Sequence, residues 1–126
     1  MIRSRYIYDI LDLMLDGDPD GFFARAQLPH LTEAEIEYTN EGAFIFFDYD
    51  GPLPEQMPDP DDLMLAGVFI ESQQEQIQAE AVLYFADGIA DCLEIFCHDG
   101  RYPARDLHSY TLTQDWGLGR VITTEA

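Results

Sequence analysis

The chain has 126 residues and a formal net charge of −19, because 25 acidic residues face only six basic ones. All six basic residues are arginine, and the chain has no lysine. The excess is far larger than solubility needs, so it argues against direct binding of nucleic acid and favours a positive partner, either a basic protein or a cation.

Two helices are predicted at the beginning of the chain. In residues 4–16, apolar residues recur at intervals of three and four and charged residues fall on the opposite side, which indicates an amphipathic helix. Ser4 is suited to cap its start. A short second helix is predicted over residues 18–27, with Phe22 and Phe23 on its buried side.

The hydrophobic period changes to two after residue 31, which is typical of strands. Glu33, Glu35 and Glu37 alternate with apolar residues, so they are predicted to form a single file on one strand face, about 6.8 Å apart. Residues 43–47 are apolar on both faces, which favours a central strand that forms a hairpin with the first. Later strands are predicted over 63–71, 77–85 and 89–97, and residues 107–112 fit either a strand or a short helix.

Helices followed by strands with short turns predict an α+β fold in a single domain, residues 1–126. We expect an antiparallel meander sheet of about five to six strands, with one or two N-terminal helices packed on one face. Residues 116–126 contain two glycines and are predicted to form a loosely held tail.

Hydrophobic residues make up 47% of the chain and aromatic residues 13%, which is enough for a core and unlike acidic disordered proteins. Asp9, Asp12 and Asp16 interrupt the first apolar stretch, so no signal peptide or membrane span is expected and the location is predicted to be cytoplasmic. Cys92 and Cys97 are five apart in one predicted strand, so they should point to opposite faces and remain free thiols.

The segment 50–62 combines prolines and acids, which disfavours a strand and predicts a long functional loop. Aromatic and methionine side chains beside carboxylates are typical of protein contacts, in which the apolar groups anchor and the charges steer. The predicted partner-binding residues are therefore Asp48, Tyr49, Asp50, Glu55, Asp59, Asp61 and Asp62, with Glu33, Glu35 and Glu37 as the second choice.

Residues 16–21 match the first half of an EF-hand calcium loop, with Asp16, Asp18 and Asp20 at the ligand positions and Gly21 at the sixth. The twelfth position is Gln27, which lacks the bidentate carboxylate that calcium needs. A helix end followed by a capped helix start therefore explains the motif better, and no metal site is predicted.

Catalysis is not expected from the sequence. His30, His98 and His108 show no arrangement typical of a catalytic pair or a metal site, and the chain has no glycine-rich phosphate loop and no lysine. No cofactor is predicted.

Residues 85–100 contain Asp87-Gly88, then Leu93-Glu94-Ile95, then Asp99-Gly100. This segment resembles the final hairpin of small acidic immunity proteins encoded beside bacterial polymorphic or contact-dependent toxins. The resemblance implies an inhibitor of a cognate toxin that has no catalysis of its own, and it assigns no individual functional residue.

These observations favour a non-catalytic inhibitor or immunity-type protein that binds a basic protein, such as a toxin or nuclease domain, with neither nucleic acid nor membrane as a direct partner. One alternative is a DNA mimic that inhibits a nucleic-acid-binding protein, which would need two parallel rows of carboxylates. Another alternative is a weak calcium-binding domain.

Overall fold

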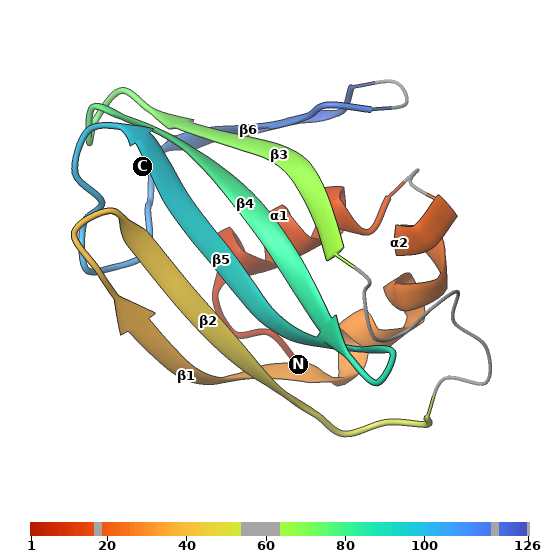
Figure 1. Ribbon diagram of the computed structural model, residues 1–126. Coiled ribbons are helices and arrows are strands. Elements are labelled where there is room, and N and C mark those ends of the chain that lie inside the picture. Colours follow the sequence, from red (N-terminus) through yellow and green to blue (C-terminus); the bar gives the residue numbers. More distant parts are fainter. Residues whose placement is uncertain (17–18, 54–63, 117–118, 126) are drawn as a thin grey trace.

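The computed structural model describes residues 1–16, 19–53, 64–116 and 119–125, which form one antiparallel sheet of seven strands with helices on one face (Figure 1). The helices are α1 (Arg5–Met14), α2 (Pro19–Ala24) and the 3-10 helix η1 (Arg25–His30). The strands are β1 (Leu31–Tyr38), β2 (Gly42–Tyr49), β3 (Met64–Ser72), β4 (Ile77–Ala86), β5 (Ile89–Asp99), β6 (Tyr110–Gln114) and β7 (Val121–Thr124). The predicted α+β class is confirmed, with seven strands in place of five to six.

The strands are not arranged in the simple meander that the sequence predicted. Their order in the sheet is β1-β2-β5-β4-β3-β6-β7. Only the pairs β1–β2, β3–β4, β4–β5 and β6–β7 are consecutive in the chain, whereas β2 pairs with β5 and β3 pairs with β6. Turn residues identify hairpins locally, but they do not determine how distant hairpins join.

Helix α1 crosses one face of the sheet, behind the strands in Figure 1, and packs against β3 and β6. The Ser4 Oγ accepts the Ile7 N–H at 3.1 Å, which confirms the predicted cap. Ile10 and Leu11 of α1 are completely buried. We call the side of the sheet that faces α1 the inner face, and the opposite side the outer face; no described helix or strand covers the outer face.

The second helical segment differs from the prediction, because α2 ends at Ala24 and continues as η1. Phe23 is 52% exposed, so its predicted burial is wrong, and Ala24 and Leu28 supply the buried side instead. The side chain of Phe22 lies outside the described residues. Gln27 is buried and ties η1 to the β4–β5 turn, because it donates to the Gly88 carbonyl at 2.7 Å and accepts the Ala90 N–H at 2.9 Å.

A bulge in β1 overturns the predicted single file of glutamates. Glu33 pairs with Phe47, yet Glu35 pairs with Phe46, so Ala34 is an extra residue on β1 and the alternation of faces reverses. Glu33 therefore lies on the inner face and is buried, whereas Glu35 and Glu37 lie on the outer face and are exposed.

The end of the chain also differs from the predicted loose tail. Residues 121–124 form β7, which pairs with β6, and Ile122 lies opposite Leu112 and packs against the core. Gly119, one of the two glycines that suggested a tail, belongs to the β6–β7 connection, where it has a positive φ of 66° and its N–H donates to the Trp116 carbonyl at 2.9 Å. Residues 117, 118 and 126 of the predicted tail lie outside the described residues.

Both cysteines lie in β5 on opposite faces, as predicted. Cys92 pairs with Tyr84 on the outer face, and Cys97 pairs with Ala79 on the inner face. Both are free thiols. None of the described helices is long and apolar enough to cross a membrane.

Candidate functional site

The outer face is left uncovered by the described helices, and it mixes aromatic and acidic side chains. The strand register places these apolar side chains of β2, β3, β4 and β5 on the outer face: Phe44, Phe46, Met64, Phe69, Val82, Tyr84, Cys92 and Phe96. The same register places Glu35, Glu37, Asp48, Glu71, Glu80 and Glu94 on this face. Met64 is 54% exposed and Phe69 is 39% exposed, so large apolar surface faces solvent beside the carboxylates.

The glutamates are interleaved with the apolar side chains. Paired residues form rows that cross the sheet, with neighbouring strands about 4.8 Å apart. In one row Glu94 lies between Phe44 and Val82. In the next row Glu80 lies between Phe96 and Phe69. Each of these two carboxylates is therefore flanked by apolar groups on both neighbouring strands.

The two central glutamates have neutral or weakly basic partners. Tyr84 donates its hydroxyl to Glu94 Oε1 at 2.8 Å. His98 Nε2 lies 3.1 Å from Glu80 Oε1, and its ring meets the ring of Phe96 edge-on at 5.3 Å between centroids. The hydrogen bond to Glu94, reinforced by burial and by the negative charge, raises the pKa of Tyr84, so its phenol stays protonated.

The positive charge of the chain lies elsewhere. None of the seven strands contains an arginine, whereas all of the acidic residues of the outer face belong to strands. The arginines are at the start of α1, in η1 and in the connections after β5 and β6, where the structure pairs them with Glu33, Asp9, Asp12, Asn40, Glu75 and Asp16. The strands therefore contribute carboxylates and no arginine to the outer face, and Arg101 reaches only its margin, where it donates to Asn40 of the β1–β2 turn.

The predicted partner-binding residues are only partly described. Asp48 is exposed on the outer face of β2, and Asp50 is exposed just beyond it. Tyr49 lies on the inner face, opposite Leu31 of β1. Its hydroxyl donates to the Pro52 carbonyl at 2.5 Å, and the centroid of its ring lies 6.0 Å from that of His30. The remaining loop residues, Glu55, Asp59, Asp61 and Asp62, lie outside the described residues.

Glu33 has a structural role that the sequence pattern did not reveal. Its carboxylate accepts the backbone N–H groups of Arg3 and Ser4, each at 2.9 Å. Burial acts to raise the pKa of this carboxyl, but the two N–H donors and the Arg3 guanidinium outweigh it, and the net pKa is lowered. Glu33 therefore holds the start of α1 on β1, whereas Glu35 and Glu37 remain available on the outer face.

The segment that matches half of a calcium loop is used for other contacts. The Asp16 carboxylate pairs with Arg120, which also lies 3.4 Å from Asp12. Gln27, at the twelfth loop position, is committed to the β4–β5 turn. Asp18 and the side chain of Asp20 lie outside the described residues. Among the described residues, no group of three or more His, Cys, Asp or Glu side chains could hold a metal ion.

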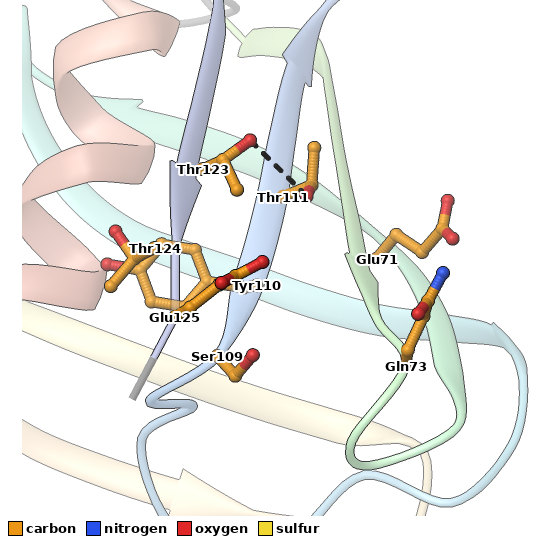
Figure 2. A pocket seen from close by; sticks show the side chains of 8 residues that line it. All are labelled: Glu71, Gln73, Ser109, Tyr110, Thr111, Thr123, Thr124 and Glu125. Atoms are coloured by element: carbon orange, nitrogen blue, oxygen red, sulfur yellow. Dashed lines mark hydrogen bonds between the residues drawn. The ribbon is translucent and has the colours of Figure 1, made fainter.

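A concave site lies near the β7 edge of the sheet, between the end of β3 and the strands β6 and β7. Figure 2 shows Thr111 and Thr123 pointing toward each other, with their hydroxyls 3.5 Å apart, and Glu71 on the neighbouring strand. The cavity volume is about 160 Å³, below the usual range for small-molecule sites. The Tyr110 hydroxyl donates to Asp9 at 2.8 Å, on the side of α1, so it is already engaged.

Sequence reasoning missed the central residues of the outer face. Phe44, Glu94 and Phe96 were read as parts of strands without a role. Their signal is the alternation in β5, where Cys92, Glu94 and Phe96 share a face opposite Leu93 and Ile95. That signal identifies two faces of a strand, but only the position of α1 on the inner face shows which of them the described helices leave uncovered.

No family model, curated protein or solved structure matches the chain.

Proposed function

We propose that the protein is a non-catalytic acidic binding protein of the inhibitor or immunity type, which neutralises a basic protein such as a toxin or nuclease domain. The observation that carries the proposal is the separation of charge: the arginines pair with groups at the periphery and on the α1 side, and the outer face keeps its carboxylates. Such a surface speeds the encounter with a positively charged partner and disfavours other acidic proteins.

The mixture of aromatic and acidic side chains supports protein binding in particular. Buried aromatic groups supply most of the contact energy in protein interfaces, and charges at their margins supply orientation. Free thiols at Cys92 and Cys97 fit the cytoplasmic location that belongs to this proposal. A DNA mimic has less support, because the outer apolar residues of β2, Phe44 and Phe46, separate the glutamates of β1 from those of β5 and β4.

The test is capture of a partner at low salt, followed by reconstitution from the two purified proteins and calorimetry at several salt concentrations. We expect a basic partner, inhibition of its activity by a stoichiometric amount of this protein, and an affinity that falls about tenfold or more between 50 and 300 mM NaCl. An affinity that is independent of salt, or a partner with a net negative charge, would contradict the proposal.

A further inference from the structure

One end of the outer face is hollowed where the β1–β2 turn meets β5. The pocket there has a volume of about 390 Å³ and is open to solvent. It is lined by Thr39, Asn40, Glu41, Gly42, Phe44, Glu94, Ile95 and Phe96.

Gly42 is the reason that this end of the face is hollow. It pairs with Phe96 of β5, and a Cβ at this position would lie 1.7 Å from the carbonyl oxygen of Ile95. Only glycine fits so close to the neighbouring backbone. As a result, no side chain from β2 stands beside Phe96, and space is left between Phe96, Phe44 and the turn.

The groups around this space suit a cation with a planar face. Phe44 and Phe96 are half-buried and present aromatic surface from adjacent strands. Glu94 is half-buried beside both, because it pairs with Phe44 and precedes Phe96 by two residues on the same face of β5, and Glu41 is exposed on the turn. Since Tyr84 contacts one oxygen of Glu94, the carboxylate retains capacity to accept further hydrogen bonds.

We propose, as an extension of the proposed function, that this pocket receives an arginine side chain of the basic partner, with the guanidinium paired to Glu94 and stacked on Phe44 or Phe96. A guanidinium is planar, is weakly hydrated and binds carboxylates through two parallel hydrogen bonds, so it suits this combination better than an ammonium group does. We name this set of residues the arginine pocket: Glu41, Gly42, Phe44, Glu94 and Phe96.

A second copy of this chain does not suit the arginine pocket. Each copy carries a net charge of −19, so the approach of two outer faces is repulsive. Arg101 donates to Asn40, which also lines this pocket, at 2.9 Å, and it lines a neighbouring pocket with Tyr38 and Tyr102. The charge of the occupant must therefore come from a different, basic protein.

The test uses the peptide Gly-Arg-Gly-Arg-Gly as a probe, with lysine and citrulline versions for comparison, in an NMR titration of the assigned protein at low salt. We expect shifts at residues 41–44 and 94–96, and contacts between arginine side-chain protons and the Phe44 or Phe96 ring. The citrulline peptide should not bind, and the lysine peptide should bind more weakly.

Two Glu→Gln variants locate the interaction. Glu94→Gln keeps an oxygen for Tyr84 but loses the charge, and it should weaken arginine-peptide binding about fivefold. The control Glu125→Gln makes the same change just beyond β7, the edge strand farthest from β1, and should have much less effect. Phe44→Ala, checked for folding by its amide spectrum, tests the aromatic surface of the arginine pocket.

The possible results separate the two proposals. The arginine pocket is overturned if Glu94→Gln and Glu125→Gln weaken peptide binding equally and the NMR shifts are spread over the surface. That result would not contradict the proposal that the protein binds a basic partner. Once a basic partner has been reconstituted, Glu94→Gln should also weaken that complex; an unchanged complex overturns the pocket in the same way. If no cationic peptide binds at low salt, the arginine pocket is overturned, whereas the proposed function is decided by the capture and reconstitution experiment.

Discussion

The carboxylate of Glu33 accepts the backbone N–H of Ser4 at 2.9 Å, where β1 passes the first turn of α1. Ser4 is the N-cap of the helix, so a buried negative charge lies at the end of α1 that carries a partial positive charge. The same carboxylate also accepts the N–H of Arg3. An acidic residue of β1 thereby fixes the position of the helix that covers the inner face.

Replacement of Glu33 by glutamine is expected to destabilise the fold by about 1–3 kcal/mol at pH 7, because one of the two partly buried N–H groups loses its carboxylate acceptor. Urea unfolding followed by circular dichroism measures the loss. The matched control is Glu35→Gln on the exposed side of the same strand, for which we expect a change within about 0.5 kcal/mol. Equal losses for the two variants would show that Glu33 does not hold α1 in place.

The cost of Glu33→Gln is also expected to depend on pH. The pKa of Glu33 in the folded protein is lower than its ordinary value of 4.5, so the stabilising contribution of the carboxylate is complete above that pH. It is lost as the pH falls through the lower folded value, since the protonated carboxyl then resembles glutamine. The difference between the two proteins, measured from pH 7 to pH 3, should shrink; a constant difference would contradict the lowered pKa.

Cys92 is expected to react slowly with thiol reagents in the folded protein. Burial, together with the negative charges of Asp91, Glu94 and Glu37, raises its pKa to about 11. About one thiol in a thousand is then ionised at pH 8, and the thiolate is the reactive form. Ellman's reagent with the Cys97→Ser variant isolates this thiol. Denaturant should restore rapid reaction, whereas reaction of the native variant at the rate of free cysteine would exclude the shielded site.

Calcium is expected to leave the thermal stability unchanged at millimolar concentration, apart from general screening. The Asp16 carboxylate is paired with Arg120, and Gln27 is held by the β4–β5 turn, so two positions of the calcium-loop pattern are already occupied. A ligand that binds only the folded state must raise the melting temperature. Magnesium and sodium chloride at equal ionic strength are the controls, because salt alone stabilises so acidic a protein. A rise specific to calcium would restore the calcium-binding alternative.

The sequence predicted the local structure well and the distant pairing poorly. Alternation and turn residues identified the strands from β1 to β5 and the Asp87-Gly88 turn, because these signals act between neighbours in the chain. The bulge at Ala34 was missed, since local alternation does not mark it, and the contacts that Glu33 makes on the inner face are with Arg3 and Ser4, some thirty residues away. The choice of β5 as the neighbour of β2 was missed for the same reason.

The candidate site was less predictable than the fold. Net charge indicated a cationic partner, but the position of the acids depends on which face α1 covers. Glu33, Glu35 and Glu37 are equivalent in the sequence pattern, yet a single extra residue buries the first and exposes the others. Glu94 gained its importance only from Phe44 and Gly42, which come from a strand about fifty residues earlier.

Gly67, the one glycine of β3, is expected to be sensitive to substitution, because it lies in a bulge of this strand against Trp116, the only tryptophan of the chain. Its φ is 101°, and a Cβ at this position would lie 3.0 Å from the ring of Trp116, whose Nε1 donates to the Asp16 carbonyl at 2.7 Å. Gly67→Ala therefore combines backbone strain with displacement of the ring, and it should cost about 2–3 kcal/mol.

Gly119→Ala is the matched control, since its φ is also positive but the nearest atom to its Cβ is 3.6 Å away. That variant should lose only about 1 kcal/mol. Trp116 fluorescence reports both unfolding curves, and the emission of the folded Gly67→Ala protein should shift as the ring moves; equal losses without such a shift would assign the whole effect to the backbone.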